Sequence, residues 1–218
     1  MSYEQYIERI EELLIEDIKT AYPKAGINED DAVGDILENI FAQYDGEKFI
    51  FVLDEWDFIF HRDFINENDK EKYVAFLSNL LKDRPYVILS YMTGILPIAK
   101  YSSGSELNMF AEFTMVNSPM FGEYFGFTDD EVREMLDYYG MKQDYETVKD
   151  WYDGYRFGNV DVYCPWDVIN HVDRLRGEPG AQPQSYWINT SGNDLVKRFV
   201  NRADKTTRDE MERLIAGE

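Results

Sequence analysis

Residues 49–55 read Phe-Ile-Phe-Val-Leu-Asp-Glu, an uninterrupted apolar run that ends in two acids. An apolar run of this length predicts a β-strand that is buried on both faces, as strands of parallel sheets are. Asp54 and Glu55 then lie at the carboxyl end of that strand, which is the edge where open α/β sheets bind their ligands. The stretch therefore predicts an α/β fold with a ligand site at the end of this strand.

The acid pair has a specific chemical interpretation. In P-loop ATPases such a pair is the Walker B motif, in which the Asp holds Mg²⁺ and the Glu orients the attacking water. The competing interpretation is that Asp54 and Glu55 only end the strand, because strands often end in polar residues. Phosphate chemistry also requires a Gly-rich GxxxxGK[ST] loop, and the 218 residues contain no such motif. The chain therefore carries the residues for half of a nucleotide site.

Two further residues are candidates for the same chemistry. Thr93 follows a second apolar run, residues 86–92, where its hydroxyl would position the attacking water as a sensor 1 residue; alternatively it caps the strand before Gly94. Arg156 lies in an aromatic stretch, from which it would reach a phosphate; alternatively it stacks on Tyr or Trp rings or pairs with Asp153. The residue pattern leaves both alternatives open.

Periodicity and turn residues predict the rest of the fold. Helices are expected at 3–20, 30–44, 69–82, 129–139, 144–151, 165–175, 191–202 and 206–215, and a capping box, Thr128 to Glu131, begins the fourth of them. Strands are expected at 48–54, 86–92 and 111–116, with a hairpin through 160–163. Alternating helices and strands indicate right-handed βαβ crossovers and a parallel sheet. We expect a partial α/β core over 1–125 and a mostly helical subdomain over 126–218.

Composition excludes several classes of function. The 43 acids and 22 bases give a net charge of −21, which repels nucleic-acid phosphates, so we expect no nucleic acid to bind this chain alone. No apolar stretch approaches the roughly 18–20 residues that span a bilayer, and the N-terminus has no signal-peptide pattern. The single Cys164 cannot form an internal disulfide, which suits the cytoplasm. Cys164, His61 and His171 lack the spacing of a zinc site.

Several segments together resemble a known family. Lys48–Asp57 and Tyr91–Lys100 are similar to the bacterial AAA-ATPase-like family, whose members are often fused to a PD-(D/E)XK nuclease-like domain. The likeness continues, in the same order, through 105–110, 126–132, 151–155 and 186–190. The resemblance implies an incomplete P-loop NTPase-like parallel sheet of about three strands flanked by helices. It also implies Mg-ATP as cofactor, Asp54 as magnesium ligand, and Glu55 and Thr93 as catalytic residues.

The chain departs from the family in one important respect. Family members begin with a strand and a Walker A loop, and Met1 of this chain comes after that point. We therefore expect the chain to bind no Mg-ATP and to be inactive as an ATPase by itself. Because the missing strand is central, we expect either that the 111–116 strand pairs with 86–92 or that an incomplete sheet edge is covered by a helix, a protein partner or a second copy. The alternative function is a non-catalytic protein-interaction module, while a nuclease is disfavoured by the acidic surface.

Overall fold

The structure is a computed structural model that describes residues 1–101, 106–114, 120–187 and 203–215. The chain divides into two compact units, Met1–Glu112 (unit 1) and Phe113–Glu218 (unit 2). Within the described residues, no helix combines the length and the apolar character that crossing a membrane requires.

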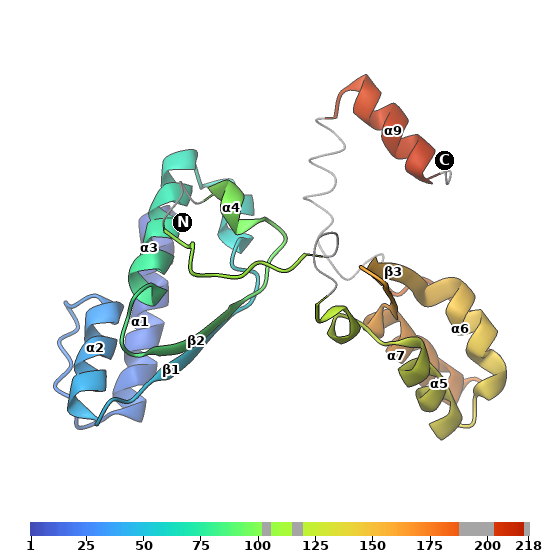
Figure 1. Ribbon diagram of the computed structural model, residues 1–218, viewed down its shortest axis with the longest axis horizontal. Helices are drawn as coiled ribbons and strands as arrows, with labels where there is room; N and C mark the ends of the chain where they lie inside the picture. Colours follow the sequence, from blue (N-terminus) through green and yellow to red (C-terminus); the bar gives the residue numbers. More distant parts are fainter. Residues whose placement is uncertain (102–105, 115–119, 188–202, 216–218) are drawn as a thin grey trace. The chain divides into compact units, whose positions relative to one another are not determined.

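Unit 1 is an α/β unit built around a pair of parallel strands (Figure 1). Its elements are α1 (Tyr3–Ala21), α2 (Val33–Gln43), β1 (Phe49–Leu53), the 3₁₀ helix η1 (Phe58–His61), α3 (Glu67–Leu81), β2 (Val87–Met92) and α4 (Ile98–Tyr101). α3 connects β1 to β2, so the predicted βαβ crossover is confirmed. The capping box of Asn66 and Asp69 begins α3.

The start of α2 differs from the sequence prediction. The helix was expected from residue 30 but begins at Val33. The Asn28 side chain accepts a hydrogen bond from the Asp30 amide at 3.4 Å and donates one to Asp31 at 2.9 Å. Local side-chain bonds of this kind offer the backbone an alternative to the helix. The acidic cluster therefore forms a turn before the helix rather than its first turn.

The predicted three-stranded parallel sheet is wrong for the described residues, where the parallel sheet has two strands. Residues 111–114 form no strand, and residues 115 and 116 of the predicted third strand lie outside the described part of the chain. High β-propensity alone does not make a strand, because a strand also needs a neighbour that accepts its backbone hydrogen bonds. The local pattern of this segment carried no information about such a neighbour.

The prediction that β1 is buried on both faces is also wrong. Phe49, Phe51 and Leu53 pack against the core, whereas Ile50 is 63% exposed and Val52 is 70% exposed. Figure 1 shows α1, α2 and α3 gathered on one side of the strand pair. A continuous apolar run predicts burial on both faces only if a second layer covers the sheet. Within the described part of unit 1, one layer of helices packs on the sheet.

Two adjoining hydrophobic clusters form the core of unit 1. One joins α2 and the end of α3 to the sheet through Ile36, Ile40, Leu80 and Tyr86. The buried Tyr86 hydroxyl donates to the Leu80 carbonyl at 2.7 Å, so its polar atom is satisfied. The other cluster lies beneath the carboxyl ends of the strands and comprises Tyr3, Trp56, Ile59, Phe60, Tyr73, Val74, Leu77 and Leu107. This second cluster supports the residues that follow β1.

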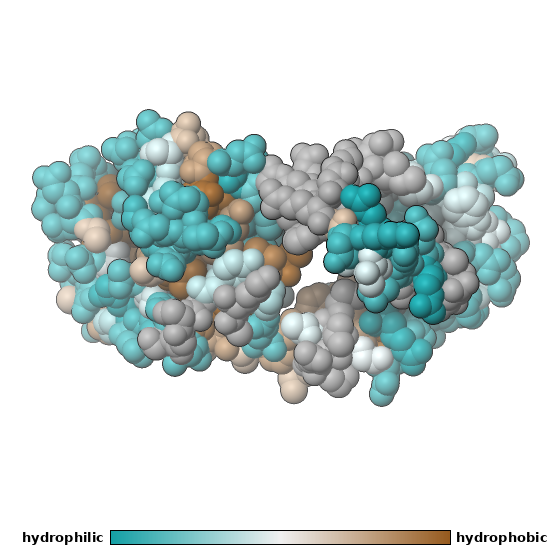
Figure 2. All heavy atoms as spheres, turned by 90° about the horizontal axis from the view of Figure 1, so that it is seen from above, coloured by the Kyte–Doolittle hydropathy of each residue, from teal (hydrophilic) through white to brown (hydrophobic). Residues whose placement is uncertain are grey.

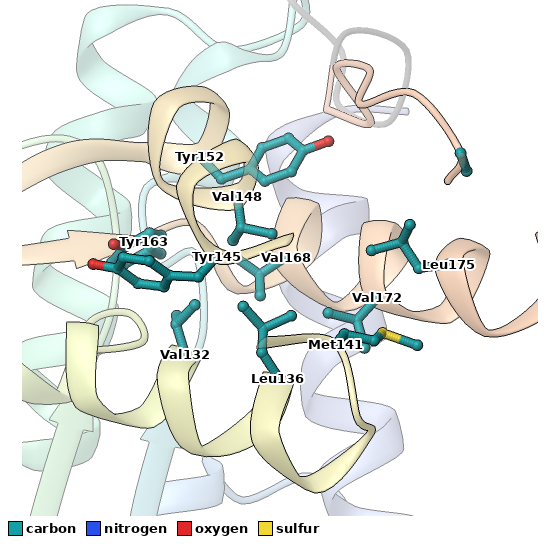
Figure 3. Packing of buried hydrophobic residues seen from close by; sticks show 11 residues of the cluster. Val132, Leu136, Met141, Tyr145, Val148, Tyr152, Tyr163, Val168, Val172 and Leu175 are labelled. Atoms are coloured by element: carbon teal, nitrogen blue, oxygen red, sulfur yellow. The ribbon is translucent and has the colours of Figure 1, made fainter. Parts of the chain in front are cut away.

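Unit 2 is mostly helical with an antiparallel hairpin. Its elements are η2 (Gly122–Tyr124), α5 (Asp129–Tyr138), η3 (Lys142–Asp144), α6 (Tyr145–Tyr152), β3 (Asp153–Phe157), β4 (Val160–Tyr163), α7 (Pro165–Gly177) and α9 (Lys205–Ile215). The predicted hairpin and four of the predicted helices are confirmed, while the expected helix at 191–202 lies outside the described residues. Figure 3 shows the core, in which side chains of α5, α6, β4 and α7 point toward one another.

A hydrogen-bonded carboxylate joins three elements of unit 2. The predicted capping box is present, with Thr128 and Glu131 bonded reciprocally at the start of α5. Asp129, in the same turn, accepts hydrogen bonds from the Tyr145 hydroxyl, the Tyr163 hydroxyl and Arg133. Burial raises the pKa of Asp129, but these hydrogen bonds together outweigh it and lower the pKa to about 2. The charged form of Asp129 therefore ties α5 to α6 and β4.

Candidate functional site

The structure brings three of the four predicted site residues together at the carboxyl ends of β1 and β2. The Thr93 hydroxyl donates a hydrogen bond to Asp54 Oδ1 and accepts one from the Glu55 amide at 3.1 Å. The backbone continues the pairing beyond the strands: the Thr93 amide donates to the Leu53 carbonyl, and the Trp56 amide donates to the Thr93 carbonyl, both at 2.9 Å. Parallel pairing brings these residues to one edge of the sheet, because it aligns the carboxyl ends of both strands, and the side-chain bonds of Thr93 then join them.

The two carboxylates of this group have different environments. Asp54 uses Oδ1 for the bond from Thr93, and its Oδ2 has no hydrogen-bond partner among the described residues. The Glu55 side chain is exposed and makes no hydrogen bond or ion pair within the described residues. Glu55 also has a φ of 50°, a left-handed conformation that costs free energy for a residue with a β-carbon. The backbone bonds of Glu55 and Trp56 to Thr93 hold this conformation in place.

Asp57, two residues further along, has a structural contact that the sequence did not reveal. Its carboxylate is 2% exposed and accepts hydrogen bonds from the amides of Ile95, at 3.1 Å, and Leu96, at 2.8 Å. His61 Nε2 lies 3.5 Å from the same carboxylate. Asp57 thus ties the loop after β2 to the turn after β1. It holds Thr93 beside the acid pair without facing the solvent.

Asp57→Asn is expected to destabilise unit 1 by about 2–3 kcal/mol, because it removes charge-assisted hydrogen bonds from a buried carboxylate. Asp54→Asn is the matched control: it is exposed and its amide oxygen still accepts from Thr93, so we expect a change below about 0.5 kcal/mol. Urea denaturation of each variant measures the change in the free energy of unfolding. Amide hydrogen exchange of β1 and β2 shows whether the change lies in the sheet. Equal effects of the two substitutions would contradict the distinct roles.

An open pocket of about 440 Å³ lies beside the acid pair. Tyr6 of α1, Trp56, Phe58 and Tyr73 of α3 supply aromatic walls, and Val52, Leu53, Asp54 and Glu55 complete the lining. The Arg62 guanidinium lies 3.7 Å from the Phe58 ring centroid. The local sequence pattern does not mark these aromatic residues as site residues. Glu-Trp-Asp after the strand was the available signal for Trp56, whereas Tyr6 reaches the site only through tertiary packing.

Arg156, the fourth predicted residue, lies in β3 of unit 2. Its guanidinium is 3.5 Å from Asp161 and donates a hydrogen bond to the Gly158 carbonyl at 3.3 Å. The partner is therefore Asp161, its cross-strand neighbour in the hairpin, and not the Asp153 that the sequence suggested. Cross-strand neighbours are set by hairpin register, which is invisible in local composition.

The acid pair offers ligands that suit a hard cation. Carboxylate and hydroxyl oxygens are the donors that Mg²⁺ prefers, and Mg²⁺ commonly keeps several waters and phosphate oxygens beside one or two carboxylates. Asp54 Oδ2 and the Glu55 carboxylate fit that limited role. In the part of the chain that the structure describes, no group of three or more His, Cys, Asp or Glu side chains is placed to hold a metal ion. The protein atoms described here therefore supply a partial coordination shell.

His171 is a buried titratable residue of unit 2. It is 1% exposed, and neither ring nitrogen has a hydrogen-bond partner among the described residues. Tyr152 and Tyr186 pack around it, with ring centroids 5.3 and 6.5 Å away. Burial lowers the pKa of His171, and the nearby Arg174 lowers it further while Asp144 opposes the shift. His171 is therefore neutral in the folded protein at pH 7.

A pH-dependent stability of unit 2 follows from this lowered pKa. In the unfolded chain His171 takes up a proton at the ordinary histidine pKa of about 6.5. The contribution of His171 to the free energy of unfolding is therefore constant well above that pH and falls as the pH drops below it. His171→Phe is expected to remove the decline between about pH 6.5 and 5. Thermal unfolding at several pH values measures it. Because His61 is the other histidine, loss of the decline in His61→Gln instead would contradict the assignment.

The whole chain was compared with known proteins in three ways. A scan against protein-family models, a search of curated proteins and a search of solved structures found no significant match. Membership of the AAA-ATPase-like family therefore stays a prediction from the sequence.

Proposed function

We propose that unit 1 is an AAA-ATPase-like core whose Asp54, Glu55 and Thr93 form the magnesium and water side of a nucleotide site. In this assignment Asp54 Oδ2 would hold the cation, and the Glu55 carboxylate would act as the general base toward water. The sequence predicted that Thr93 positions the water; its hydroxyl donates to Asp54 and accepts from the Glu55 amide, so we assign it the role of holding Asp54 beside the Glu55 backbone. Bound Mg²⁺ would neutralise charge on the phosphates. The observation that carries the proposal is the hydrogen-bonded grouping of these residues at the ends of adjacent parallel strands.

The conformation of Glu55 adds support to this proposal. Strained backbone conformations cluster at functional sites, where the surrounding structure holds them in place. The left-handed φ of Glu55 directs the chain sharply after the strand, and two backbone bonds to Thr93 fix the turn. The backbone of Glu55 is therefore held in one conformation, from which its exposed carboxylate is accessible to a ligand.

The phosphate side of the site is not part of this proposal for the 218-residue chain. Backbone amides of a Gly-rich loop and its Lys supply most phosphate contacts in such sites, and the sequence contains no GxxxxGK[ST] motif. Acids alone repel a nucleotide phosphate chain. We therefore expect that calorimetric titration of Mg-ATP into the chain detects no binding with a dissociation constant in the micromolar range. Micromolar binding that is lost in Asp54→Ala would contradict this expectation.

The cation half of the proposal is tested with Mn²⁺ as a paramagnetic substitute for Mg²⁺. Substoichiometric Mn²⁺ is expected to broaden the amide signals of Asp54, Glu55 and Thr93 first, and Asp54→Asn is expected to abolish this preference. Asp30 and Asp31 form the internal control, because they are adjacent acids in the turn before α2. Equal broadening at both acid pairs would show diffuse attraction to an acidic surface and would overturn the assignment.

A further inference from the structure

The sheet face of unit 1 that points away from α1, α2 and α3 carries large apolar side chains. Ile50, Val52, Leu89 and Tyr91 are 63%, 70%, 55% and 52% exposed. The strand register places Ile50 beside Leu89 and Val52 beside Tyr91, so the four side chains form one patch, here called the bare face. Figure 2 shows apolar residues at the surface of unit 1 among hydrophilic ones. Strands of parallel sheets are normally covered on both faces, and contiguous exposed apolar patches mark interaction sites.

The bare face continues into the pocket beside the acid pair. Val52 belongs to both, since it is exposed on the sheet and also lines the pocket. Asp54 and Glu55 stand at this shared end, and Trp56 supplies an aromatic wall. Aromatic rings and carboxylates together attract an ammonium or guanidinium group. The Arg62 guanidinium, 3.7 Å from the Phe58 ring centroid, is an example of such a contact within this chain.

The dimensions of the bare face match a single helix. Two neighbouring strands span about 10 Å with their side chains, and five residues extend about 17 Å. An α-helix is about 10 Å wide, and three of its turns rise about 16 Å. A helix is also the element that ordinarily covers a parallel sheet. One amphipathic helix is therefore large enough to cover the four side chains of the bare face.

A second copy of the chain fits this face less well. Four residues on two strands bury far less than the roughly 800 Å² per partner that a standard interface needs. Face-to-face pairing would also bring together two chains that each carry a net charge of −21, and like charges oppose association. The acids at the shared end instead complement a basic partner.

We propose that the bare face and its adjoining pocket bind a basic amphipathic α-helix of a protein partner. Apolar side chains of the helix cover Ile50, Val52 and Leu89, and a Lys or Arg near one end of the helix enters the pocket against Asp54 and Glu55. This surface rests on apolar exposure and charge, and it does not require Asp54 to bind Mg²⁺. It assigns a role to the aromatic pocket walls that the nucleotide site leaves unused.

The test uses the full 218-residue chain and a synthetic peptide of about 14 residues, long enough to form a helix on binding. The peptide carries Leu at i, i+3, i+4 and i+7 and Lys at one end. A scrambled peptide of the same composition lacks the apolar stripe. Methyl NMR is expected to show shifts at Ile50, Val52 and Leu89 with the striped peptide only. Val52→Thr, which keeps the β-branched shape, is expected to weaken binding about tenfold.

Ile169→Thr is the matched control, because Ile169 is a 50% exposed aliphatic residue of α7 in unit 2. This substitution is expected to leave peptide binding unchanged. Equal binding of both peptides would overturn the proposal in favour of attraction by charge alone. A dimer in sedimentation velocity that Val52→Thr dissociates would overturn it in favour of a second copy. Absence of binding would also overturn it, and a large fall in melting temperature in Val52→Thr would then identify the chain's own residues as the cover.

Discussion

Gly94→Ala is expected to destabilise unit 1 by about 3 kcal/mol and to displace Thr93 from the acid pair. A β-carbon at residue 94 would lie 2.4 Å from Trp56 Cδ1 and 2.6 Å from Asp57 Oδ1. Trp56 is 4% exposed and Asp57 is 2% exposed, so neither side chain moves without disturbing the core. The substitution therefore separates the loop after β2 from the turn after β1. Urea denaturation measures the loss, and amide hydrogen exchange of Glu55 and Trp56 reports the displaced loop.

Gly26→Ala is the control for this prediction. Nothing lies within 4 Å of a β-carbon built at Gly26, and the residue belongs to the same unit. We expect a change within about 0.5 kcal/mol for this exposed substitution. If Gly94→Ala and Gly26→Ala changed the free energy of unfolding equally, Trp56 would not be closely packed against residue 94. The candidate site would then lack the rigid support that positions Thr93.

Leu77→Ala is expected to destabilise unit 1 by about 3 kcal/mol, within the usual range of 2–5 kcal/mol for buried leucine truncations. Leu77 is 1% exposed and belongs to the cluster that also contains Trp56 and Tyr73. Its truncation leaves a cavity beneath two walls of the pocket. The transfer of methyl groups and the unfilled volume both contribute to the cost. Chemical denaturation with hydrogen exchange of α3 amides measures it.

Leu13→Ala provides the comparison within the same unit. Leu13 lies on α1 and is 43% exposed, so its truncation removes fewer buried contacts. A loss below about 1 kcal/mol is expected, since alanine also favours the helix. Similar losses for Leu77→Ala and Leu13→Ala would show that the cluster beneath the pocket is loosely packed. In that case the pocket walls would not be held in one arrangement.

The sequence predicted the candidate site in outline because its signals are local. An apolar run followed by Asp54 and Glu55 predicted a strand and a polar end, and a second run placed Thr93 at the end of another strand. Parallel pairing then aligned the two ends. The sequence did not predict that Asp57 anchors the loop after β2. That role depends on a contact with Ile95 and Leu96 across the sheet.

Helix positions and strand positions were determined by residue order, because periodicity and capping act over a few neighbouring residues. Burial of β1 on one face only, the absence of a strand at 111–114, and the pairing of Arg156 with Asp161 were decided by packing. Each depends on which distant element lies alongside, and a single segment carries no record of that neighbour. The same limit hid the pocket, whose walls come from α1, α3 and the turn after β1. The local sequence was therefore enough to identify Asp54 and Glu55 as candidate site residues, whereas the residues that surround them were decided by tertiary packing.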